Sequence, residues 1–117
     1  MVKHCDGNLY PILDLLVEQG IDCLNPIEPA AGMDIGKVKK LIGQKIALWG
    51  NIDCSHLLTF GTTEDVKKAT IECIKAASPG GGHIISSSNT IHDSIPAENF
   101  IAMVQTARKY GKYPLNL

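Results

Sequence analysis

The chain has 117 residues, 44% of them hydrophobic, and its formal net charge is −1. This length allows a single domain with its own core. Basic residues are interspersed with acidic ones and no apolar run approaches the ~20 residues that cross a bilayer, so the composition argues against a nucleic-acid partner and a membrane partner. The first residues also lack the apolar core of a secretion signal, which predicts a cytoplasmic protein.

The elements predicted in chain order alternate between strand and helix. Four short apolar segments favour strands, at residues 2–6, 21–27, 45–52 and 83–87. Each strand is followed by apolar residues at helical spacing, within residues 9–17, 35–42, 66–77 and 100–107. Strands that alternate with helices predict a parallel sheet with right-handed crossovers.

The last two helices carry the clearest local signals. Thr62-x-x-Asp65 resembles a capping box, with Asp in place of Glu, at the start of the third helix. The buried face of the fourth helix is predicted from its apolar stripe, which consists of Phe100, Met103, Val104 and Ala107. The four cysteines are widely separated, and we expect them to be free thiols.

The predicted fold class is α/β, with four βα units that make half of a (β/α)8 TIM barrel. A closed barrel of this kind typically has about 250 residues, so residues 1–117 are predicted to form a single partial domain. The sheet of such a half has two exposed edges, at its first and last strands, where another chain can pair. We therefore expect a homo-oligomer or a complementing amino-terminal half.

Polar residues follow each predicted strand. The four clusters are His4–Asn8, Asn25–Glu28, Gly50–Asp53 and Ser86–Asn89, with His92 just beyond the last. Because parallel strands all end at one edge of a sheet, these clusters are predicted to converge on one site. From this convergence we predict a substrate-binding set of Glu28, Trp49, Asn51, Asp53, Asn89 and His92.

Strand alternation predicts which side chains face the barrel axis. In the third strand, Trp49, Asn51 and Asp53 are expected to share the inner face, and in the first strand His4 and Asp6 share a face. Plainer alternatives remain open at this stage. His4 and Asp6 are either metal ligands or a hydrogen-bonded pair, Trp49 is either a pocket wall or ordinary packing, and His92 either binds an anion or caps a loop.

Two motifs resemble the carboxyl-terminal half of uroporphyrinogen decarboxylase. They are Gly50-Asn51-Ile52-Asp53 after an apolar strand and Ile91-His92-x-x-x-Pro96-x-Glu98 before the last helix. The stretches His4-x-Asp6-Gly7-Asn8 and Ile27–Asp34 are more similar to the wider decarboxylase-like superfamily, which includes cobamide-dependent methyltransferases. The resemblance covers essentially the whole chain and implies strands five to eight of the parent barrel.

The sequence also departs from the decarboxylase pattern. A histidine expected at the end of the last strand is Asn89 here, and a proline expected after Asp53 is Cys54. The resemblance further implies that the catalytic aspartate and the propionate-binding arginines belong to the amino-terminal half. We therefore expect that this chain alone does not decarboxylate a porphyrinogen.

The methyltransferase branch implies a metal site. Its zinc is held by a His-x-Cys pair and a later cysteine, and here His4 matches the first ligand while Asp6 stands at the second and Ser88 or Asn89 at the third. The resemblance thus implies zinc or another divalent metal at His4 and Asp6, with harder ligands than thiolates. It implies cobamide as the methyl donor for a methyltransferase, and no cofactor for a decarboxylase.

Three functions follow from these patterns. The chain is half of a methyl-transferring barrel enzyme, half of a uroporphyrinogen decarboxylase of porphyrin biosynthesis, or a catalytically silent half-barrel that binds or assembles. In the first two cases the partner is a small molecule, namely a corrinoid, a thiol or a tetrapyrrole.

Overall fold

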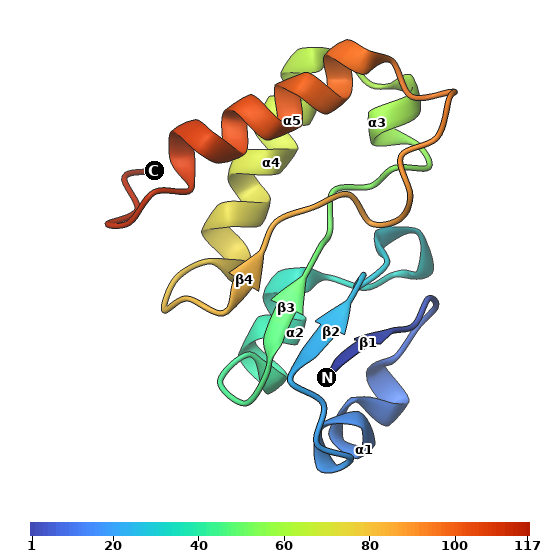
Figure 1. Cartoon of the computed structure of the whole chain (residues 1–117), viewed down its shortest axis with the longest axis vertical. Helices are drawn as coiled ribbons and strands as arrows, with labels where there is room; N and C mark the ends of the chain where they lie inside the picture. Colours follow the sequence, from blue (N-terminus) through green and yellow to red (C-terminus); the bar gives the residue numbers. More distant parts are fainter.

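A computed structural model describes residues 1–117, and it contains one parallel sheet with helices on one side (Figure 1). The strands are β1 Val2–His4, β2 Cys23–Asn25, β3 Ala47–Trp49 and β4 His83–Ile84. The α-helices are α1 Leu13–Glu18, α2 Ile35–Ile42, α3 Leu57–Phe60, α4 Thr63–Ala77 and α5 Ala97–Tyr110. Two short 3₁₀ turns, Tyr10–Ile12 and Pro29–Ala31, precede α1 and α2.

The sheet order is β1-β2-β3-β4, and every neighbouring pair is parallel. Parallel neighbours require a crossover after each strand, which the helices supply. The prediction of four βα units in half of a barrel is confirmed in its strand order and direction. None of the helices is both long and apolar enough to cross a membrane.

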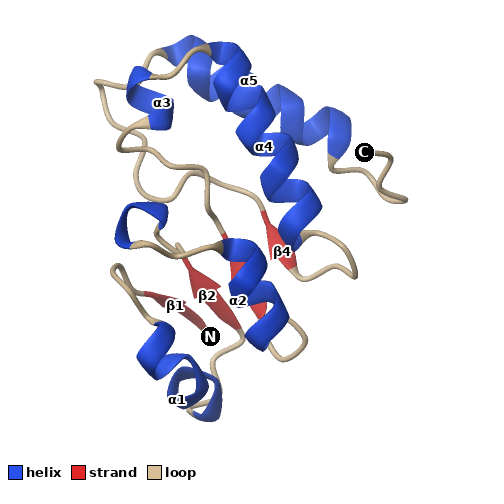
Figure 2. Ribbon diagram, turned by 180° about the vertical axis from the view of Figure 1, so that it is seen from behind, coloured by secondary structure: helices blue, strands red, loops and turns tan.

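The two faces of the sheet have different surroundings. Leu24 and Leu48 are paired in the register and fully buried under the helices, which lie on the near side of the sheet in Figure 2. On the opposite face, Val2 is 54% exposed, Trp49 36% and Ile84 50%, whereas Cys23 beside Val2 is buried. The hydrophobic core therefore lies between the sheet and the helices, and no helix covers the inner face.

The third strand is shorter than predicted, and this corrects the expected orientation of Asn51. β3 ends at Trp49, because Gly50 takes a φ of +152° and its Cα passes against the backbone of Pro26. Asn51 is consequently buried on the helix side, where its Nδ2 donates to the Ile27 carbonyl at 2.8 Å. The prediction that Asn51 shares the inner face with Trp49 is wrong.

The buried face of α5 also differs from the prediction. The structure buries Asn99, Ala102, Met103 and Thr106, whereas Phe100 is 39% exposed and Val104 and Ala107 are only partly covered. Asn99 is accommodated because its Nδ2 donates to the carbonyls of Leu58 and Gly61. The apolar stripe of α5 is thus only partly covered within this chain.

Two local predictions are confirmed. The capping box at the start of α4 is present, with Thr62 and Asp65 each accepting from the backbone N–H of the other. All four cysteines are free, and three of them are buried.

We predict that Gly50→Ala destabilises the fold. A Cβ at this position would lie 2.1 Å from the Pro26 carbonyl oxygen, so the backbone must shift, and we expect a loss of about 3 kcal/mol or more in the free energy of unfolding. The control is Gly20→Ala, at a φ of +79° with no atom within 4 Å of the new Cβ, which should cost about 1 kcal/mol. Equal losses for both variants in urea unfolding would contradict the close approach at Gly50.

We also predict that Asp65 makes stability depend on pH. Hydrogen bonds from the side chain and then the backbone of Thr62 lower the pKa of Asp65. Its contribution is therefore present above the ordinary carboxyl pKa and disappears as the pH falls through the lowered value. In unfolding experiments Asp65→Asn should be less stable than the parent at about pH 6, and this difference should shrink towards about pH 2. An equal difference at both pH values would contradict the role of the Asp65 carboxylate in the capping box.

Candidate functional site

A cavity of about 260 Å³ opens at the carboxyl ends of the strands on the uncovered face. Every strand contributes to it: His4 ends β1, Asn25 ends β2, Trp49 ends β3, and the segment after β4 supplies the rest. The lining residues are His4, Asn25, Trp49, Ser86, Ser87, Asn89 and Thr90. Of the predicted site residues, the structure therefore brings His4, Trp49 and Asn89 together.

A chain of hydrogen bonds fixes the imidazole of His4. The Nδ2 of Asn25 donates to the Trp49 carbonyl at 3.1 Å, which leaves the Oδ1 of Asn25 as an acceptor. That Oδ1 lies 2.5 Å from Nδ1 of His4, so Nδ1 must carry a hydrogen. In the neutral imidazole the other nitrogen, Nε2, then carries a lone pair.

This lone pair faces the Asp6 carboxylate. Nε2 of His4 lies 3.5 Å from Oδ1 of Asp6, and the Nδ2 of Asn89 donates to the same oxygen at 3.4 Å. When His4 is neutral, Nε2 and Oδ1 are two acceptors side by side with no hydrogen between them. The pair is arranged to receive a hydrogen-bond donor or a proton.

The cavity is polar but carries no fixed positive charge. Its lining contains asparagine, serine and threonine side chains beside one histidine and one tryptophan, and no lysine or arginine. The nearest charged side chain that contacts the lining is the Asp6 carboxylate. This half of the site therefore favours uncharged polar groups or hydrogen-bond donors over carboxylates.

The residues present do not make a zinc site by themselves. Catalytic zinc takes three protein ligands, and no group of three His, Cys, Asp or Glu side chains in this structure is arranged to hold a metal ion. His4 and Asp6 supply two, and the neighbouring position is an asparagine amide that already donates to Asp6. We therefore derive no step through a metal.

Glu28 and Asp53 lie near the strand ends but hold backbone in place instead of lining the cavity. The Glu28 carboxylate accepts from the Gly7 N–H at 2.6 Å and so ties the end of β1 to the end of β2. Asp53 accepts from the backbone N–H groups of Ser55, His56 and Leu57. The sequence prediction that both lie at the common cavity is wrong, because backbone N–H groups hold both carboxylates, from the end of β1 for Glu28 and from the following turn for Asp53.

His92 also lies outside the cavity. Its side chain is exposed, and its carbonyl accepts from the Ile95 N–H in the turn before α5. The residues that sequence reasoning left out of the site are Asn25, Ser86, Ser87 and Thr90. The register could have identified Asn25, because it stands directly opposite His4.

Behind β3, Asn51 belongs to a buried network on the helix side. The thiol of Cys73 lies 3.7 Å from Oδ1 of Asn51 and 3.8 Å from the Gly50 carbonyl, and burial raises the pKa of Cys73 to about 11. His83 Nε2 donates to the same carbonyl at 2.8 Å, and burial lowers the pKa of His83. The side chains of Cys73 and His83 are therefore uncharged near neutral pH. Their contacts with the Gly50 carbonyl and with Asn51 hold the end of β3 in place.

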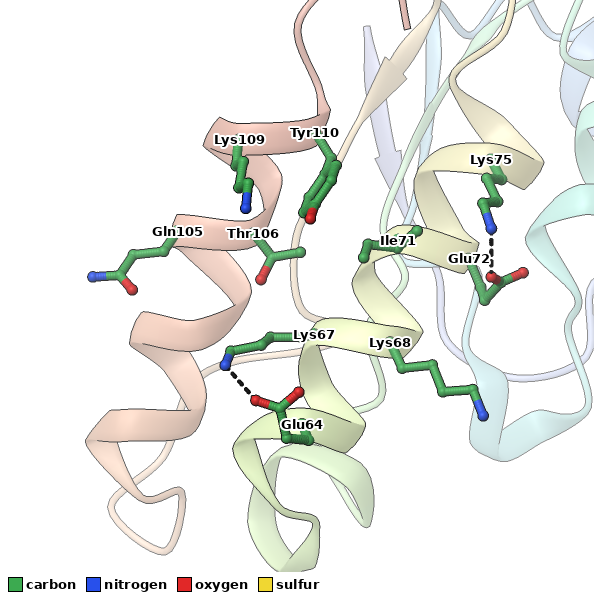
Figure 3. Close-up of a pocket in the computed structure, with 10 residues that line it drawn as sticks. All are labelled: Glu64, Lys67, Lys68, Ile71, Glu72, Lys75, Gln105, Thr106, Lys109 and Tyr110. Atoms are coloured by element: carbon green, nitrogen blue, oxygen red, sulfur yellow. Dashed lines mark hydrogen bonds and ion pairs between the residues drawn. The ribbon is translucent and has the colours of Figure 1, made fainter. Parts of the chain in front are cut away.

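The largest cavity is a surface groove of about 520 Å³ between α4 and α5 (Figure 3). It contains none of the strand-end residues, and its side chains come from the two helices alone. Two of its lysines are paired with glutamates, Lys67 with Glu64 and Lys75 with Glu72. Lys109 lies over the ring of Tyr110. These pairings describe a solvated helix surface, so we place the functional site at the strand ends.

Comparisons with known proteins agree with this architecture. The profile of the family described as "Uroporphyrinogen decarboxylase (URO-D)" matches residues 1–110. The chain is 34% identical to a uroporphyrinogen decarboxylase of Azoarcus over 80 residues, which cover 68% of this chain and 22% of that protein. It is 29% identical to the Shewanella halifaxensis protein of the same name, with 96% of this chain and 34% of that protein covered.

A solved structure provides a second comparison. A methyltransferase from Methanosarcina mazei superposes with a TM-score of 0.80 at 25% sequence identity, over 95% of this chain and 31% of that one. The chain thus spans between about a fifth and a third of the length of these relatives. With the family profile matched over nearly all of its length, the chain belongs to the uroporphyrinogen decarboxylase family.

Proposed function

We propose that this chain forms the carboxyl-terminal half of a barrel enzyme that transfers a methyl group to a small thiol, with a cobamide as the methyl donor. The observation that carries the proposal is the fixed acceptor pair at the cavity, His4 Nε2 beside Asp6 Oδ1. A thiol acceptor must lose its proton to become nucleophilic, because the thiolate is the reactive form. An acceptor pair with no hydrogen of its own suits this step.

The proposed roles follow from the hydrogen bonds. Asn25 holds His4 with Nε2 directed to Asp6, so the thiol proton passes to Nε2 as the S–H bond breaks. A cobamide, when bound, would supply the methyl group: the sulfur electron pair would form the new S–C bond, and the electrons of the bond to the donor would stay on the donor. Asp6 lies where it attracts the protonated imidazole, and Trp49 forms an apolar wall of the cavity.

The lack of positive charge in the cavity lining favours a small thiol as substrate over a tetrapyrrole with many carboxylates. Carboxylates are held by paired cationic or N–H donors, and the lining of this half offers no lysine or arginine. The structural relative from Methanosarcina mazei is described as a methyltransferase, and this description independently supports methyl transfer as the reaction.

Uroporphyrinogen decarboxylase activity is the second candidate, because the family profile and the curated relatives carry that name. In that case the groups that bind the carboxylates of the tetrapyrrole would come from outside this chain. Asn89 would then stand at the strand end where the family resemblance implies a histidine. A catalytically silent binding module is the third. For all three we propose that the chain is inactive alone, because it spans only about a fifth to a third of the length of its relatives.

We predict that a small thiol binds at the cavity. In a titration of the 117-residue chain with 2-mercaptoethanol, followed by NMR, the Trp49 indole and the side-chain amides of Asn25 and Asn89 should shift. His4→Phe should abolish these shifts, because it removes both the Nδ1 donor and the Nε2 acceptor. His92→Phe, an exposed histidine outside the cavity, is the matched control and should leave them unchanged.

The same titration distinguishes the candidates. Uroporphyrin, a polycarboxylate, should leave the three resonances unshifted, whereas methylcobalamin should perturb Trp49 in the presence of the thiol. Shifts with uroporphyrin and none with the thiol would favour the decarboxylase. No shift with any of these compounds would favour the silent module.

A further inference from the structure

The groove between α4 and α5 contains a threonine whose hydroxyl has no hydrogen-bond partner within the chain. Thr106 of α5 is only 6% exposed and lines this groove. On the facing helix, the hydroxyl of Thr70 donates to the Val66 carbonyl one turn earlier at 2.7 Å, whereas the Thr106 hydroxyl makes no such bond. Every side-chain nitrogen or oxygen that is shielded from solvent has a partner in this structure, so the Thr106 hydroxyl must open onto the groove.

A second hydroxyl without a partner lies on the same face of α5. Thr106 and Tyr110 are four residues apart in the helix, so their side chains are neighbours. The hydroxyls of Tyr10 and Tyr113 are hydrogen-bonded to backbone groups, whereas the Tyr110 hydroxyl is not. Figure 3 shows the side chains of Thr106 and Tyr110 pointing from α5 into the space between the two helices. The groove therefore offers two hydroxyl groups to a ligand.

The charge around these two hydroxyls is positive. The groove lining contains four lysines and two glutamates, and each glutamate forms an ion pair with a lysine of its own helix. The other two lysines, Lys68 and Lys109, form no ion pair with a carboxylate. The ammonium group of Lys109 lies 5.0 Å from the centroid of the Tyr110 ring, and thus close to the hydroxyl-bearing face of α5. An excess of positive charge in a groove favours an anion over a neutral or cationic ligand.

The donors in the groove match a phosphate group. A phosphate accepts hydrogen bonds through several oxygens that point in different directions, so it can engage hydroxyl and ammonium donors from both helices at once. A carboxylate has only two oxygens in one plane and would engage fewer of them. The groove has a volume of about 520 Å³, which leaves room for an organic group beside the phosphate. Ile71 and the Tyr110 ring provide an apolar wall for that group.

We infer that the groove between α4 and α5 binds a small molecule that carries a phosphate group, with Thr106, Tyr110 and Lys109 donating to the phosphate oxygens. Lys67 extends from α4 towards α5 in Figure 3 and adds positive charge from the other side. The site shares no residue with the strand-end cavity, and both helices that form it belong to this chain. It is therefore a second site, whichever reaction the cavity supports.

Inorganic phosphate is the first probe. In an NMR titration of the 117-residue chain, phosphate should shift the backbone amides of residues 67–75 and 105–110 and the shifts should saturate. Sodium chloride keeps the ionic strength constant throughout, because salt screens the charges of exposed lysines. Shifts of the same size with chloride alone would overturn the inference, as would the absence of any shift with phosphate.

Two pairs of variants locate the contact. Thr106→Val removes the hydroxyl and keeps the side-chain shape, so it should weaken phosphate binding about tenfold. Thr70→Val is the same change on the facing helix, at a hydroxyl already bonded to the backbone, and it should bind like the parent. Lys109→Gln should also weaken binding, whereas Lys40→Gln on α2 should not. Equal weakening within either pair would contradict the site. Lys109 is exposed, so its variant provides the answer if Thr106→Val folds poorly.

Two organic probes test the class of ligand. Phenyl phosphate should bind more tightly than inorganic phosphate, because its ring can lie against Ile71 and Tyr110 while its phosphate engages the donors. Benzoate has the same ring with a carboxylate, and it should bind more weakly than phenyl phosphate. Equal binding of benzoate and phenyl phosphate would contradict the selection of a phosphate group. Tighter binding of inorganic phosphate than of phenyl phosphate would overturn the inference that the ligand is an organic molecule.

Discussion

The parallel direction of the four strands is the constraint on which the rest of this structure depends. Each parallel neighbour requires a helical crossover, and the crossovers lie on one face of the sheet. One face is therefore buried under helices around Leu24 and Leu48, while the other keeps Trp49 and Ile84 accessible. The same direction places every strand end, and hence every polar cluster, at one edge.

The cavity obtains its chemistry from contacts between segments far apart in the sequence. His4 is oriented by Asn25, which is itself held by the Trp49 carbonyl, and Asp6 is reached by Asn89 from the other end of the chain. These bonds connect the ends of β1, β2 and β3 with the segment after β4. A single imidazole nitrogen facing a carboxylate results from four strand ends acting together.

Sequence patterns predicted the repeating architecture and the capping box because both depend on local spacing. The α4 start needs only Thr62 and Asp65 three residues apart, and the βα alternation needs only apolar periodicity. The strand pattern gave a wrong prediction for the end of β3, because a segment distant in the sequence determines where that strand ends. β3 ends early because Gly50 passes against Pro26, and Asn51 then turns to the Ile27 carbonyl and the Cys73 thiol. The short helix α3 was not predicted, because its four residues show no periodicity of their own.

The sequence by itself determined the fold class, the family resemblance and the convergence of polar strand ends, since each follows from residue order and spacing. Only the tertiary structure decided which polar residues face the cavity. Asn25 and His4 are 21 positions apart and meet through strand pairing, while Glu28 and Asp53 are held by backbone N–H groups. Tertiary packing also decided that α5 buries Asn99 and leaves Phe100 exposed, because Leu58 and Gly61 supply the carbonyls that satisfy the amide.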